Sequence, residues 1–142
     1  MWWVGLSSGM SNIQLLIPDT MPTSVGYSQV ATVTGGTMVL IAGQVALDRT
    51  GTVVGRDDFR AQAQQVFENL DAAVVAAGGT FRDVIKLNTY VLDLAHLAVF
   101  REVRDTYINL QSPPASTAIQ VARLFRPEFL LEIEAVAVVD RD

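Results

Sequence analysis

The chain has 142 residues, a formal net charge of −5, one histidine and no cysteine. This length suits one domain that folds without cross-links, and the lack of cysteine excludes disulfides, thiol nucleophiles and cysteine-rich zinc sites. Because His96 is the only imidazole, we expect no metal and no cofactor, and the acidic balance argues against nucleic acid, whose phosphates are bound by Lys and Arg.

The composition is apolar for a small protein, with 50% hydrophobic and 18% charged residues. Burial between subunits would hide this excess. The first ten residues lack the basic start and long apolar run of a secretory signal, and no later run suits a membrane span, so we expect a cytoplasmic protein without a membrane partner. Residues 1–16 are interpreted as an N-terminal tail, its first nine either flexible or a misassigned start, and residues 17–142 as one domain.

Two short β-prone runs open the predicted domain. Residues 30–33 and 38–42 flank Gly35-Gly36, a pair that tolerates the positive φ angles of a tight turn, which predicts a hairpin. A second turn is predicted at residues 48–51, before the short run Val53-Val54.

A helix is predicted over residues 59–77, where apolar residues recur every three to four positions and Gln62 falls on the opposite, polar side. Asp57 or Asp58 can cap its start, and Gly78-Gly79 its end. Residues 84–92 then alternate apolar and polar side chains, as in a strand.

Asp93 stands where the cap of a second helix is expected, and this helix ends before Pro113-Pro114. Closing strands are predicted over residues 117–121 and 130–139. The order β-β-α-β-α-β-β predicts an α+β fold with two helices packed on one face of a sheet.

The final predicted strand contains two carboxylates, Glu132 and Glu134, in an otherwise apolar run. A spacing of two residues places both on the same face of a strand. A carboxylate in a buried or cleft-facing position is costly unless it is paired, hydrogen-bonded or used in chemistry. From the residues alone, the pair either lines a cleft or faces water along an edge strand.

Four motifs resemble those of the Rid family, the YjgF-type reactive-intermediate deaminases also described as L-PSP endoribonucleases. They are Gly26-Tyr27-Ser28-Gln29, Ala42-Gly43-Gln44-Val45-Ala46-Leu47-Asp48, Phe67-Glu68-Asn69-Leu70 and Glu132-Ile133-Glu134-Ala135-Val136-Ala137. The likeness covers residues 22–139. It implies a chorismate-mutase-like fold, with a mixed sheet and two helices on one face, assembled as a homotrimeric barrel with clefts between neighbouring subunits.

The resemblance also implies a reaction, the hydrolysis of 2-imino acids to 2-oxo acids and ammonia. Glu132 matches the glutamate responsible for the attacking water, and Tyr27 and Gly43 match positions that line the cleft. Asn88 shares a strand face with Tyr90; packing at the edge of the core is its simpler explanation, although it could contact a ligand.

Three positions depart from the family pattern. Ser116 stands where the pattern has an arginine that binds the substrate carboxylate, Gly26 replaces a proline, and Arg101 replaces a helix asparagine. A neutral hydroxyl cannot reproduce the bidentate contact of arginine with a carboxylate. Arg101 could supply the missing guanidinium, with Arg104 as second choice.

These substitutions leave alternatives open. Arg101 is otherwise a solvated helix residue paired with Glu102 or Asp105, and Ser116 and Thr117 either bind a ligand or satisfy nearby backbone groups. We therefore predict a hydrolase of small imines or enamines with an altered substrate class. The alternative is a non-catalytic trimer that binds a small molecule or a partner protein in the same cleft, and ribonuclease activity is the least favoured function because the chain is acidic.

Overall fold

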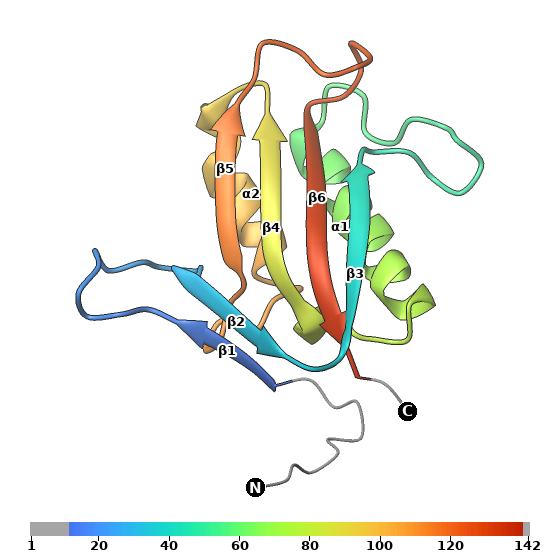
Figure 1. Cartoon of the computed structure of the whole chain (residues 1–142). Coiled ribbons are helices and arrows are strands. Elements are labelled where there is room, and N and C mark those ends of the chain that lie inside the picture. Colours follow the sequence, from blue (N-terminus) through green and yellow to red (C-terminus); the bar gives the residue numbers. More distant parts are fainter. Residues whose placement is uncertain (1–11, 141–142) are drawn as a thin grey trace, which may run out of the picture.

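The computed structural model describes residues 12–140, and a four-stranded mixed sheet forms its centre (Figure 1). The strand order is β3-β6-β4-β5. The bounds are β3 Thr37–Gln44, β6 Leu131–Val139, β4 Val84–Val91 and β5 Ala115–Gln120. Strand β6 pairs antiparallel with both β3 and β4, whereas β4 and β5 are parallel. The long β6 strand, which carries both glutamates, is therefore central.

Two helices connect these strands and cover one face of the sheet. Helix α1, Phe59–Ala76, links β3 to β4, and α2, Leu97–Arg104, links β4 to β5 after the short 3-10 helix η2, Leu94–His96. A second 3-10 turn, η1 at Phe81–Asp83, precedes β4. Figure 1 shows α1 and α2 together behind the sheet. The predicted α+β architecture, with two helices on one face, is confirmed.

The ends of α1 follow the local sequence signals. Of the two candidate caps, Asp58 is the one that acts, because its side chain accepts a hydrogen bond from the Ala61 backbone N–H at 3.1 Å. Gly78 follows the helix with a φ of +91°, a conformation that glycine adopts without steric cost. The helix is therefore delimited as its sequence predicts.

The core lies between the helices and the sheet. Among its largest buried apolar side chains are Phe67, Phe100, Leu70, Leu87, Leu131 and Ile133. The alternating burial of β6 sends Leu131 and Ile133 into this core and leaves Glu132 and Glu134 together on the opposite face. The shared face of the two carboxylates is thus confirmed.

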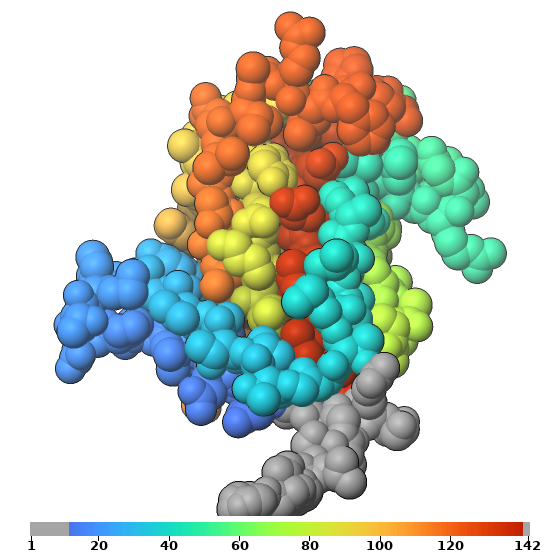
Figure 2. Space-filling model, viewed as in Figure 1, coloured from blue at the N-terminus to red at the C-terminus, as the bar shows by residue number. Residues whose placement is uncertain are grey.

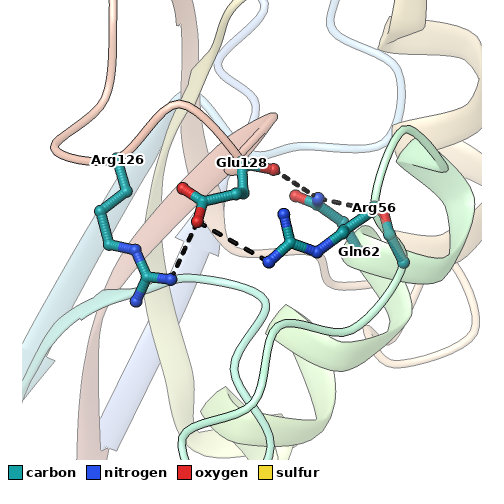
Figure 3. A network of polar contacts seen from close by, with 5 residues as sticks. Arg56, Gln62, Arg126 and Glu128 are labelled. Carbon is teal, nitrogen blue, oxygen red and sulfur yellow. Dashed lines mark hydrogen bonds and ion pairs between the residues drawn. The ribbon is translucent and has the colours of Figure 1, made fainter.

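Gln62 was predicted on the polar side of α1, and this prediction is wrong because the side chain is fully buried. Its Nε2 donates to the carbonyls of Gly55 and Glu128 at 3.1 and 2.8 Å, and its Oε1 accepts from the Leu130 N–H at 2.9 Å. Arg126 also contacts the Glu128 carboxylate, at 3.1 Å (Figure 3). Gln62 therefore joins α1 to the segment that enters β6.

The predicted hairpin between the first two runs is also wrong. Strand β2, Val30–Thr34, pairs antiparallel with β1, Asn12–Leu16, in a separate two-stranded sheet, while β3 pairs with β6. Gly35 and Gly36 have φ angles of +75° and +77° and lead the chain from one sheet into the other. Residues 12–16, assigned to a tail, thus form a paired strand, and residues 1–11 lie outside the described part.

The face of the main sheet opposite the helices carries exposed apolar side chains. Leu40 is 74% exposed there, beside Met38 on β3, and Ile119 is exposed on β5. Figure 2 shows this face uncovered across β3, β6, β4 and β5. An apolar surface of this kind usually marks an interaction site.

Candidate functional site

Glu132 and Gly43 are brought together by the pairing of β6 with β3. The register of these strands shifts between Ile41 and Gln44, which introduces an irregularity beside Glu132. A Cβ atom added to Gly43 would lie only 2.6 Å from Glu132 Oε2, so the carboxylate packs directly against the glycine backbone. The absence of a side chain at position 43 thus creates the space that Glu132 occupies.

The surroundings of Glu132 favour its protonated form. Partial burial raises the pKa of this carboxyl above its usual range, and the nearby charge of Glu134 raises it further. A carboxylate with a raised pKa accepts and returns protons more readily near neutral pH than an ordinary glutamate. Glu132 is therefore the candidate general base of this site.

Glu134 occupies a polar network on the same face as Glu132. Its Oε1 accepts hydrogen bonds from the Tyr90 hydroxyl at 2.8 Å and from Asn88 Nδ2 at 3.1 Å. The bond to Glu134 is the main cause that raises the pKa of Tyr90, so this hydroxyl remains protonated. Asn88 therefore contacts Glu134. The two glutamates differ in their contacts, because Glu134 accepts hydrogen bonds from Tyr90 and Asn88, whereas Glu132 packs against the Gly43 backbone.

A second group of predicted site residues lines a cavity of about 420 Å³ between α2, β5 and the segment before β2. Tyr27, Arg101, Ser116 and Thr117 all lie along it. The hydroxyl of Thr117 accepts a hydrogen bond from Lys86 Nζ at 3.0 Å. Four of the predicted residues therefore meet in one place, and one of their hydroxyls already has a protein partner.

Tyr27 is held at this cavity by its neighbour in sequence. The Ser28 N–H donates to the Pro114 carbonyl at 3.0 Å, and the buried Ser28 hydroxyl donates to the Pro113 carbonyl at 2.6 Å. These bonds join the segment before β2 to the start of β5. Tyr27 thereby lies close to Ser116, although about ninety positions separate them in the sequence.

Arg101 does not form the ion pair with Glu102 or Asp105 that was the alternative to a role in ligand binding. Glu102 pairs with Arg60, and Asp105 accepts a hydrogen bond from Arg104. Among residues 12–140, Arg101 forms no ion pair with an acidic side chain. Its guanidinium is therefore a charged group at the cavity without an acidic partner in the described chain.

Glu132 and Ser116 lie on opposite faces of the sheet, whereas Thr117, which is paired with Asn88, points to the same face as Glu132. Ser116 is paired with Leu87, whose side chain is buried beneath the helices, whereas Glu132 is paired with Tyr90 on the uncovered face. Residues three positions apart on one strand point to opposite faces. A single chain therefore does not bring Glu132 to the Ser116 cavity.

One residue that the sequence did not single out lies near Gly43. Phe125 is 68% exposed and lines a cavity of about 790 Å³ together with Gly43, Asp48 and Asn69. An aromatic residue beside Arg126 and Pro127, in a stretch without a strand or helix pattern, was the available signal. Its position beside the catalytic candidate became evident only from the fold.

The family model described as Endoribonuclease L-PSP matches residues 18–139. The chain belongs to this family, the Rid family. Within it, a RutC family protein from Pyrococcus horikoshii is 37% identical over 126 residues, covering 87% of this chain and 96% of the relative. A 2-iminobutanoate/2-iminopropanoate deaminase from Salmonella typhimurium is 35% identical over 123 residues, covering 84% and 93%.

Solved structures agree with this Rid assignment. The Rid protein YyfB from Yersinia pestis superposes with a TM-score of 0.83 at 37% identity, covering 90% of this chain and 99% of the other. RidA from an Antarctic Psychrobacter gives 0.67 at 40% identity, covering 89% and 99%. The chorismate-mutase-like Rid fold is thus established for this chain.

No helix within residues 12–140 has the length and apolar character required to cross a membrane. Across the same residues, no group of three or more His, Asp or Glu side chains is arranged to hold a metal ion.

Proposed function

We propose that this Rid protein hydrolyses small reactive imine or enamine intermediates, with Glu132 activating the water. The observation that carries the proposal is the half-buried Glu132 carboxylate held against Gly43, with its pKa raised. The names of relatives support it: one is a 2-iminobutanoate/2-iminopropanoate deaminase, and TdcF of Escherichia coli, 37% identical over 106 residues, is named as a reactive intermediate deaminase.

The chemistry requires one proton acceptor that later acts as a donor. Glu132 takes a proton from water as the water oxygen attacks the imine carbon and the C=N double bond becomes a single bond. The protonated carboxyl group gives this proton to the nitrogen, so that the carbon carries one hydroxyl and one amino group. Glu132 then takes the hydroxyl proton as the C=O bond forms and passes it to the amino nitrogen, which leaves as ammonia. Tyr27, Ser116 and Thr117 would orient the ligand, and Arg101 would supply its counter-charge.

The proposal needs a second copy of the chain, because Glu132 and Ser116 lie on opposite faces of one sheet. We propose a homotrimer in which Gly43 and Glu132 of one copy face Tyr27, Arg101 and Ser116 of the next. The uncovered apolar face and the high hydrophobic content both support self-association. The bound partner of the assembled cleft would be a small molecule.

The test is ammonia release from freshly generated 2-iminopropanoate. We expect hydrolysis faster than in buffer, and Glu132→Gln should abolish the acceleration because an amide cannot accept the proton. Glu102→Gln is the matched control, because Glu102 pairs with Arg60 on the exposed helix surface. Hydrolysis no faster than in buffer for several imino acids would reject the deaminase proposal.

A non-catalytic binding protein is the second candidate, and Ser116 favours it, because a neutral hydroxyl stands where the family pattern has the carboxylate-binding arginine. Ser116→Arg decides between the two. If this variant creates imine hydrolysis where the natural protein has none, the natural cleft serves binding. If the natural protein already hydrolyses imines, the second candidate fails.

The family's description as an endoribonuclease suggests a third activity, which the net charge of −5 opposes. Binding of an RNA backbone relies on a positively charged surface. Incubating RNA with a nuclease-free preparation tests it, and cleavage that copurifies with the protein and is lost in Glu132→Gln would favour it.

A further inference from the structure

Arg104 is a buried cation at the edge of the ligand cavity. Its residue is only 5% exposed, and burying a guanidinium is costly unless partners compensate the charge. Nε donates to Asp105 Oδ1 at 2.9 Å, and Nη2 lies 2.8 Å from the same oxygen. The guanidinium carbon also lies 5.8 Å from the centre of the Phe100 ring. These contacts fix the position of the side chain.

The fixed guanidinium lies directly against Gly26, the residue before Tyr27. A Cβ atom added to Gly26 would come within 2.3 Å of Arg104 Nη2 and 3.1 Å of its Cζ. Gly26 also has a φ of +79°, whereas proline is restricted to a φ near −65°. Gly26, which stands where the family pattern has a proline, and Arg104 therefore depend on each other, because a side chain at position 26 would collide with the guanidinium.

Arg104 also determines which partner Asp105 has. Arg101 precedes Asp105 by four residues, a spacing at which oppositely charged helix residues pair. Asp105 instead bonds to Arg104, and Arg101 is left at the cavity without an acidic partner in the described chain. Without Arg104, the Asp105 carboxylate would be free to neutralise Arg101.

We infer that Arg104 is a positioning residue for the ligand cavity: it supports the Gly26-Tyr27 segment and holds Asp105 away from Arg101. This inference rests on the proposed function in so far as it assigns Tyr27 and Arg101 to the ligand. It also resolves the choice between the two arginines, because Arg104 is committed to protein contacts and Arg101 is the one available to a ligand.

The test compares Arg104→Met, which keeps the bulk of the side chain, with Arg104→Lys and with Arg60→Met as matched control. Arg60 is an exposed helix arginine that also pairs with an acidic side chain, Glu102. For imine hydrolysis, Arg104→Met should raise KM about tenfold and change kcat less, because its effect is on ligand placement. Arg104→Lys should recover part of the loss, because it retains the charge that holds Asp105.

A second measurement does not depend on activity. Amide hydrogen exchange over residues 24–29 should accelerate in Arg104→Met and in Gly26→Ala, but not in Arg60→Met. The double variant Gly26→Ala/Arg104→Met should exchange no faster than the faster single variant, because both changes break one contact. If Arg104→Met fails to fold, Arg104→Lys provides the test, because Gly26→Ala by itself also strains the backbone at a φ of +79°.

The inference would be overturned if Arg104→Met had the same exchange rates over residues 24–29 and the same KM as Arg60→Met. Additive effects on exchange in the double variant would also overturn it. A chain that hydrolyses no imine but shows the expected exchange pattern would refute the proposed function and leave the positioning role of Arg104 intact. The failures of the two proposals are therefore distinguishable.

Discussion

Replacing Gly43 with alanine should impair catalysis without unfolding the protein. The new Cβ would lie 2.6 Å from Glu132 Oε2, whereas ordinary van der Waals contact begins near 3.4 Å, so the carboxylate must move by about 0.8 Å. Misplacing a reacting group by about 1 Å can lower a rate by roughly 10²-fold. Because the displaced atoms end a flexible side chain and Gly43 does not have a positive φ, we expect a stability change below about 0.5 kcal/mol.

Gly51→Ala is the matched control and should have the opposite effect. Gly51 has a φ of +80°, and nothing lies within 4 Å of a Cβ atom added there. An alanine at this φ is strained by about 1 kcal/mol, so this variant should unfold at a lower temperature but hydrolyse imines normally. Initial rates of ammonia release and thermal unfolding, measured on both variants, check the pair. Wild-type activity in Gly43→Ala would refute the placement of Glu132 against this glycine.

Further predictions concern the buried side chain of Gln62 and the neighbouring carboxylates of Glu132 and Glu134. Gln62→Leu should destabilise the protein by about 3 kcal/mol in urea unfolding, because three backbone groups lose their partners at about 1 kcal/mol each, whereas the exposed Gln64→Leu should cost little. Activity should fall as the pH drops through the raised pKa of Glu132, because the base must be ionised to act, and a pH-independent rate would contradict this role. Glu134→Gln should shift that acidic limb to lower pH because it removes a charge that raises the Glu132 pKa, whereas Tyr90→Phe keeps the charge and should leave the limb in place.

The sequence predicted the elements whose pattern is local. The spacing of apolar residues identified α1, and the alternation in β6 placed Glu132 and Glu134 on one face. It could not predict that β2 pairs with β1, because strand pairing depends on segments that are distant in sequence. The burial of Gln62 was missed for the same reason, since its partners come from two other segments.

The candidate site was predictable only in part. The family motifs identified Tyr27, Gly43 and Glu132 one by one, but the division of the site between two faces depends on strand register. The link between Gly26 and Arg104 joins residues 78 positions apart, each of which looks unremarkable alone. Such contacts follow from the packing of α2 against the segment before β2.

The most direct test of a site shared between copies is subunit complementation. Glu132→Gln and Arg101→Gln chains, each expected to be poorly active alone, are co-expressed with different affinity tags, and mixed oligomers are isolated through both tags. The account predicts that mixed oligomers regain imine hydrolysis, because some clefts then combine an intact Glu132 from one chain with an intact Arg101 from another. Mixed oligomers no more active than either parent would contradict it.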